Sequence, residues 1–133
     1  MAKTFHCSIV TPAAQVFDGP LVYASIPAWD GQIGVAPERV ALVAKLGDGM
    51  ARLEAEDGSE RFLFLAGGFA EMKNNQLTLL TTETVEPAEV DREKAREQLR
   101  EAEAEVAVGD EAVEQRDRQA NRARTLLELA DHS

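Results

Sequence analysis

The chain has 133 residues, of which 44% are hydrophobic, enough for one packed domain or for a small domain with an appendage. Its formal net charge of −10 disfavours nonspecific binding to nucleic acid or to an anionic membrane surface. No apolar run reaches the roughly 18 residues of a membrane-spanning helix, we expect no secretory signal, and the single cysteine, Cys7, suits a reducing compartment.

Residues 1–86 carry the patterns of short β-strands separated by turns. Phe5, Cys7 and Ile9 alternate with polar residues in the first of these runs. Further runs of this kind follow at residues 22–27, 40–46, 50–55, 61–66, 69–73 and 76–82. Asp57-Gly58 and Asn74-Asn75 are typical of tight hairpin turns. The spacing predicts an all-β domain of about ten short antiparallel strands, in a sandwich or a barrel.

The stretch DGQIGVAP, residues 30–37, concentrates residues with special backbone properties. It does not match a phosphate-binding loop, because no lysine and no serine or threonine follow the last glycine. Two interpretations remain open for residues 28–34. The segment is either a tight corner within the sheet or a loop that contacts a partner protein.

Residues 87–133 change to a helical pattern. Pro87 suits the first turn of a helix, and Ala95, Leu99, Ala102 and Val106 recur at helical spacing. Gly109 is expected to end the first helix, with Asp110 capping a second. The sequence therefore predicts a C-terminal antiparallel helical hairpin after the β-domain. Because its apolar stripe is mostly alanine, the hairpin is expected to be a weakly held unit.

Four arginines cluster in the predicted second helix, at positions 116, 118, 122 and 124. One interpretation is an ordinary solvated helix face. The other is a docking strip for an acidic partner.

Residue sets for catalysis are not found. Cys7 falls on the inward phase of its strand and is expected to be a core residue. His6 and His132 are far apart in sequence and give no metal-ligand spacing. We expect no catalytic residue, no metal and no bound cofactor.

The order of motifs resembles the epsilon subunit of the rotary F-type ATP synthase, whose mitochondrial counterpart is called delta. The resemblance covers nearly the whole chain and rests on Val16-Phe17-Asp18-Gly19, SIPAWDGQIGVAP, RFLFLAGGFAEM, NNQLTLL and a helical hairpin rich in alanine, arginine and glutamate.

This resemblance implies a β-sandwich at residues 1–86 and a helical hairpin at residues 87–133. It implies a non-catalytic central-stalk rotor subunit that couples proton translocation to ATP synthesis. Its partners would be the gamma subunit and the membrane rotor ring, with the alpha and beta subunits as further candidates. It would be a peripheral membrane protein, held through the complex on the cytoplasmic face of the bacterial plasma membrane or an organelle equivalent. The hairpin would inhibit ATP hydrolysis when extended.

The resemblance also implies contact residues. Trp29, Asp30 and Gln32 would face the rotor ring, although Trp29 could instead be partly buried beneath its own loop. Arg39 stands where relatives carry a histidine that faces gamma. Arg116, Arg118, Arg122 and Arg124 resemble the basic face that meets the beta subunit, which favours the docking interpretation.

The run Val90–Ala95 matches a nucleotide-binding motif of some relatives, but with one departure. Asp91 is present, and Lys94 replaces the motif's arginine. Lysine offers a point charge instead of a planar fork, which argues against ATP binding. The alternative function remains an ATP-sensing regulatory switch whose hairpin gates hydrolysis.

Overall fold

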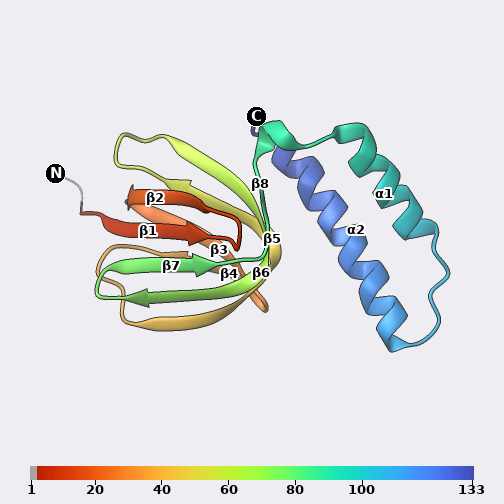
Figure 1. The fold of residues 1–133 in the computed structure, drawn as a ribbon, viewed down its shortest axis with the longest axis horizontal. Coiled ribbons are helices and arrows are strands. Elements are labelled where there is room, and N and C mark those ends of the chain that lie inside the picture. Colours follow the sequence, from red (N-terminus) through yellow and green to blue (C-terminus); the bar gives the residue numbers. More distant parts are fainter. Residues whose placement is uncertain (1–2) are drawn as a thin grey trace. The chain divides into compact units, whose positions relative to one another are not determined.

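The computed structural model describes residues 3–133, which form two compact units divided between Thr84 and Val85 (Figure 1). The first unit is built from strands, and the second contains a short 3-10 helix and two α-helices. The strands are β1 (Phe5–Val10), β2 (Gln15–Leu21), β3 (Tyr23–Ala28), β4 (Gly31–Val35), β5 (Leu42–Glu54), β6 (Glu60–Lys73), β7 (Gln76–Leu80) and β8 (Thr84–Val85). The predicted architecture, a β-sandwich followed by a helical hairpin, is confirmed.

The strands form one continuous sheet in the order β2-β1-β7-β6-β5-β3-β4, with β8 pairing to β6. Two details differ from the prediction. The described residues form eight strands instead of about ten, because β5 and β6 each run through a glycine-containing segment that was expected to break them. The pairing is also not antiparallel throughout, since β1 and β7 run parallel.

In the two long strands, β5 and β6, the side chains that point into the core shift from one set of alternate positions to the other. The shift occurs around four glycines, Gly47, Gly49, Gly67 and Gly68, which we call the glycine crease. In β6, Leu63 and Leu65 point into the core before the crease, and Ala70 and Met72 do so after it. This shift from odd to even positions requires an irregularity, because side chains alternate strictly along a regular strand. The partner strand β5 shifts between Leu46 and Ala51, and Leu46 pairs directly with Gly68.

The crease allows one sheet to fold over on itself and enclose a single core. Side chains from β1 to β7 share that core, including Ile9, Ile26, Leu53, Leu65 and Leu77. Fully burying a side chain of this size contributes about 1.5–3 kcal/mol, so this unit has the larger share of apolar stabilisation. Cys7 lies in this core as predicted and is fully buried.

Residues 28–34 form a tight corner within the sheet, which is the first of the two interpretations left open by the sequence. Only Trp29 and Asp30 form a turn, and the chain continues directly into β4, which pairs with β3 from Gly31 to Val35. Gly31 has a φ of 137°, which only glycine adopts readily, so the glycine supports the tight return. DGQIGVAP is therefore a hairpin turn with its returning strand.

The second unit begins with the 3-10 helix η1 (Pro87–Glu89) and continues into α1 (Arg92–Ala104) and α2 (Asp110–Ala130). Asp91 caps α1 by accepting a hydrogen bond from the Lys94 backbone N–H at 3.1 Å. The two helices pack antiparallel. Their buried residues are mostly alanines, with two leucines in α2: Ala95, Ala102, Ala120, Ala123, Leu126, Leu129 and Ala130.

Three expectations about the hairpin were wrong. Gly109 does not end the first helix, because α1 ends five residues earlier, at Ala104 with Glu105 as its C-cap. Gly109, with a φ of 92°, is instead the N-cap of α2, so Asp110 is the first residue of that helix and not its cap. Val106 does not extend the buried stripe, because it lies beyond the end of α1 and is 89% exposed.

The crease gives a direct stability prediction. A Cβ at Gly68 would lie 1.8 Å from the carbonyl oxygen of Leu80, and the φ of 116° is unfavourable for any other residue. Gly68→Ala should therefore lower the free energy of unfolding by about 3 kcal/mol or more, measured by chemical denaturation. Gly58→Ala is the matched control, because Gly58 also has a positive φ, of 87°, but faces open space. The control should cost only about 1 kcal/mol, and equal losses would contradict the steric argument.

Candidate partner-binding surfaces

A patch of large apolar side chains lies exposed on the sandwich, and we call it the Phe69 patch (Val43, Phe69 and Leu80). These three residues are 74%, 58% and 52% exposed. They come from three adjacent strands, since β6 lies between β5 and β7. Phe69 pairs directly with Leu80 across the β6–β7 ladder. Contiguous exposed apolar side chains of this kind are characteristic of interaction surfaces.

Two shallow cavities flank the Phe69–Leu80 pair. One, of about 420 Å³, is completed by Val10, Pro12 and neighbouring threonines. The other, of about 220 Å³, includes Val43 and Thr78. Both are open and mainly apolar, so they suit side chains of a partner protein better than a charged ligand.

The glycine crease explains why Phe69 points outward. Gly68 approaches the Leu80 backbone so closely that no side chain fits there. The next residue, Phe69, projects from the opposite face with Glu71, which is also exposed. Gly67, Gly68 and Phe69 lie within the motif RFLFLAGGFAEM, which indicated the family but did not by itself predict the patch. The sequence did contain the information, because Phe69 alternates with the core residues in step with Glu71 and Lys73, two charged residues expected to face solvent.

The β3–β4 turn carries the candidate contacts Trp29, Asp30 and Gln32. Trp29 is 70% exposed, so it is not buried beneath its own loop. Asp30 is exposed beside it. Gln32 differs, because its side chain accepts a hydrogen bond from Ser25 Oγ at 3.0 Å and donates one to the Met50 carbonyl. The turn therefore presents Trp29 and Asp30, whereas Gln32 is engaged within its own sheet.

Arg39 lies in the connection between β4 and β5. Its guanidinium Nη1 donates a 2.7 Å hydrogen bond to the carbonyl oxygen of Gly34. The side chain thus lies back against β4, the strand that precedes this connection. The neighbouring Val40 is 84% exposed and is the projecting apolar residue of this connection.

The four arginines of α2 do not share one face. At 100° per residue, Arg118 lies about 200° around the helix from Arg116, so they point to nearly opposite sides. Arg116 is half-buried and contacts the Glu105 carbonyl and Asp117, while Arg124 pairs with Glu103 at 3.6 Å. A single four-arginine docking strip is therefore not present in the hairpin described here.

The open end of the hairpin is fastened by one arginine, which we call the Arg92 clasp. Arg92 Nη1 lies 2.9 Å from Asp131 Oδ1, and Nη2 donates at 2.9 Å to the Ala130 carbonyl. It joins the start of α1 to the end of α2, where the helix dipole is negative and the last turn holds no basic residue. Polar bonds thus supplement the alanine packing.

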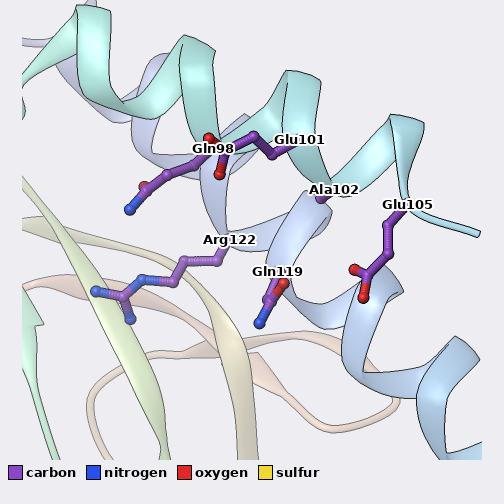
Figure 2. Close-up of a pocket in the computed structure, with 6 residues that line it drawn as sticks. All are labelled: Gln98, Glu101, Ala102, Glu105, Gln119 and Arg122. Carbon is purple, nitrogen blue, oxygen red and sulfur yellow. The ribbon is translucent and has the colours of Figure 1, made fainter. Parts of the chain in front are cut away.

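Two cavities lie within the second unit. Figure 2 shows the larger, of about 470 Å³, with side chains from both helices around it. It combines Glu101, Glu105, Gln98 and Gln119 with Arg122, and this mixture of charges selects no one class of ligand.

The smaller cavity, of about 300 Å³, lies at the beginning of α1. It is lined by Asp91, Lys94 and Arg122. Asp91 and Lys94, the two residues that match the nucleotide-binding motif of some relatives, therefore share a cavity with a second basic side chain. Glu89 also lines it, and Asp91 is already engaged as the N-cap of α1.

Among the described residues, no group of three or more His, Cys, Asp or Glu side chains is placed to hold a metal ion. Burial raises the pKa of the Cys7 thiol to about 12, with a smaller contribution from Asp18, so the thiolate that a nucleophile needs is suppressed. Within residues 3–133, no helix combines the length and apolar character needed to cross a bilayer.

The fold defines a protein with a strand-built unit that exposes apolar side chains and a helical appendage. Residues 4–87 match the family model described as the ATP synthase delta/epsilon chain, beta-sandwich domain. The ATP synthase epsilon chain of Delftia acidovorans is 32% identical over 128 residues, covering 96% of this chain and 88% of the relative. The epsilon chain of Dichelobacter nodosus is 36% identical over 97 residues, covering 73% and 68%.

Solved structures agree with this relationship. A chain in the Euglena gracilis mitochondrial ATP synthase, solved as OSCP, F1 and c-ring, matches with a TM-score of 0.75 and 25% identity, over 96% of this chain and 78% of its own length. A chain of the Tetrahymena thermophila mitochondrial ATP synthase matches with a TM-score of 0.66 at 11% identity, which supports the fold alone. The chain belongs to the ATP synthase delta/epsilon family, and it is an accessory, non-catalytic subunit.

Proposed function

We propose that the chain is a central-stalk rotor subunit of an F-type ATP synthase, which couples proton translocation to ATP synthesis by binding the gamma subunit and the membrane rotor ring. The observation that carries this proposal is the Phe69 patch, an exposed apolar surface on an otherwise well-packed sandwich. Membership of the delta/epsilon family supports it. The related Euglena chain comes from an assembly that contains F1 and the c-ring.

We assign the gamma contact to the Phe69 patch. An interface core depends on large apolar and aromatic side chains that a partner desolvates, and the patch supplies Val43, Phe69 and Leu80 together. The exposed Trp29–Asp30 turn is the corresponding candidate for the rotor ring. The chain would then be held peripherally, at the cytoplasmic face of a bacterial membrane or its organelle equivalent, through its partners.

The gamma assignment predicts a loss of affinity when the patch becomes polar. Phe69→Ser should raise the Kd for a gamma-containing core complex by about tenfold or more, because a buried aromatic anchor would be lost. Surface plasmon resonance would measure this effect. Val106→Ser is the control, since Val106 is an equally apolar exposed site in the other unit. An unchanged Kd for Phe69→Ser, with the fold intact, would contradict the assignment.

We further propose that the hairpin restrains ATP hydrolysis by the assembled enzyme. Its support is energetic, because the buried residues between the helices include four alanines and a polar clasp fastens the open end. A unit held in this way can change conformation at a cost of a few kcal/mol, as a switch requires. The alpha and beta subunits are the candidate partners of an opened hairpin.

Truncation tests the regulatory proposal. Removing residues 88–133 should leave the sandwich folded and should increase the steady-state ATPase rate of the assembled complex. The measurement needs a matched complex with the full chain, at equal subunit content. A rate that does not change would reduce the hairpin to a structural role and would leave the proposed gamma contact unaffected.

A second candidate function, ATP sensing, is favoured by one observation. The cavity of about 300 Å³ places Lys94 and Arg122 together at the start of α1, where two cations could face a polyphosphate. Opposing it, Glu89 lines the same space and Lys94 lacks the forked geometry of arginine.

ATP sensing predicts a ligand-dependent melting temperature. Binding that is specific to the folded state stabilises it by RT ln(1 + [L]/Kd), about 2.7 kcal/mol when the ligand is at 100 times its Kd. Millimolar ATP should then raise the Tm, and Lys94→Ala should abolish the rise. A Tm that is insensitive to ATP would remove this candidate and leave the leading proposal unaffected.

A further inference from the structure

The side chain of Asn75 joins three separate segments at one end of the sandwich. Its Oδ1 accepts a 2.8 Å hydrogen bond from the Glu38 backbone N–H, and its Nδ2 donates a 2.8 Å bond to the Thr4 carbonyl. Its backbone carbonyl also accepts from the His6 N–H at 3.1 Å. Lys3 completes the junction through a 3.0 Å ion pair with Glu38. The β6–β7 turn therefore holds both the N-terminal segment and the β4–β5 connection.

The contact with Glu38 is the informative one, because Glu38 has an unfavourable backbone conformation. Its φ is 61°, in the left-handed region that residues other than glycine rarely adopt. Such a conformation persists only when its surroundings hold it in place. The amide oxygen of Asn75 supplies that restraint at the Glu38 backbone N–H, and Lys3 adds an exposed ion pair with the Glu38 carboxylate.

The restraint decides what the connection presents to its surroundings. Arg39 is held against the Gly34 carbonyl, so its charge is directed toward its own sheet. Val40 follows and is 84% exposed. The chain then enters β5, where Val43 belongs to the Phe69 patch. Val40 is thus a further exposed apolar residue on the segment of chain that leads into Val43.

We propose that Asn75 is a positioning residue that preorganises residues 36–41, so that Val40 contacts the same gamma subunit that covers the Phe69 patch. This inference rests on the proposed function. The partner surface would offer an apolar depression for a branched side chain. Holding the connection in one conformation before association removes an ordering cost that a flexible connection would incur on binding.

The chain supplies a closely matched control for this role. Asn74 is the same residue type, is adjacent, and has a similar left-handed φ of 51° against 61° for Asn75. Within residues 3–133, the Asn74 side chain makes no hydrogen bond. Glycine accepts this backbone conformation at both positions, so Asn75→Gly and Asn74→Gly should both fold.

The experiment measures the affinity of the full chain for a gamma-containing core complex. Asn75→Gly should raise the Kd by about tenfold, as expected when the binding-competent conformation becomes a minor population. Asn74→Gly should leave the Kd unchanged. Asn75→Asp keeps an acceptor for the Glu38 N–H but loses the donor to Thr4, so its Kd should remain close to that of the unmodified chain.

A double-mutant cycle with Val40→Ser distinguishes positioning from general support. If Asn75 acts by presenting Val40, Asn75→Gly should weaken binding little further once Val40 has been replaced. Hydrogen exchange gives a second readout, because the Glu38 amide should exchange faster in Asn75→Gly and not in Asn74→Gly.

The possible outcomes separate the two proposals. If the unmodified chain does not bind the core complex, the proposed function itself fails. If it binds and Asn75→Gly has the same Kd, or if the cycle is additive, the positioning role is overturned and the proposed function stands. A loss of affinity confined to Asn75→Gly, absent in the Val40→Ser background, supports the inference.

Discussion

The close approach of two strand backbones at the glycine crease is the constraint on which the sandwich depends. Gly68 meets the carbonyl of Leu80 where no side chain has room, and its register partner Leu46 lies just before the change of face in β5. Without this irregularity, a strand as long as β6 would keep one apolar phase throughout. The crease moves the inward phase from Leu65 to Ala70, and a single sheet can then close around one core.

The glycine crease also gives the two faces of β6 different side chains. On one side of β6, large side chains fill the core; on the other, Phe69 is released to the surface between Val43 and Leu80. The helical unit differs, since most of its buried residues are alanines and arginines form polar contacts between its two helices. A sandwich with a core of large side chains and a helical unit with many small buried side chains thus coexist in one chain.

The sequence was sufficient for the elements whose signals are local. Asp57-Gly58 and Asn74-Asn75 form turns with positive φ, Cys7 is a core residue, and both helices form. Glycine, however, signals a turn and a strand irregularity equally well, so two long strands were predicted in fragments. The arginines of α2 were grouped by their closeness in sequence, although helical periodicity alone separates Arg116 from Arg118. The Arg92 clasp and the Asn75 junction join residues far apart in sequence, and no local pattern predicts such bonds.

The Arg92 clasp makes the two ends of the helix pair unequal in their polar contacts. At the open end, one guanidinium reaches both Asp131 and the Ala130 carbonyl at 2.9 Å. Toward the linker, the bonds of Arg116 and Arg124 to α1 are longer, at 3.5 and 3.6 Å. The polar restraint between the helices is therefore shorter at the open end than near the linker. Because these ion pairs are largely exposed, dissolved salt screens them, and the electrostatic part of the restraint weakens as ionic strength rises.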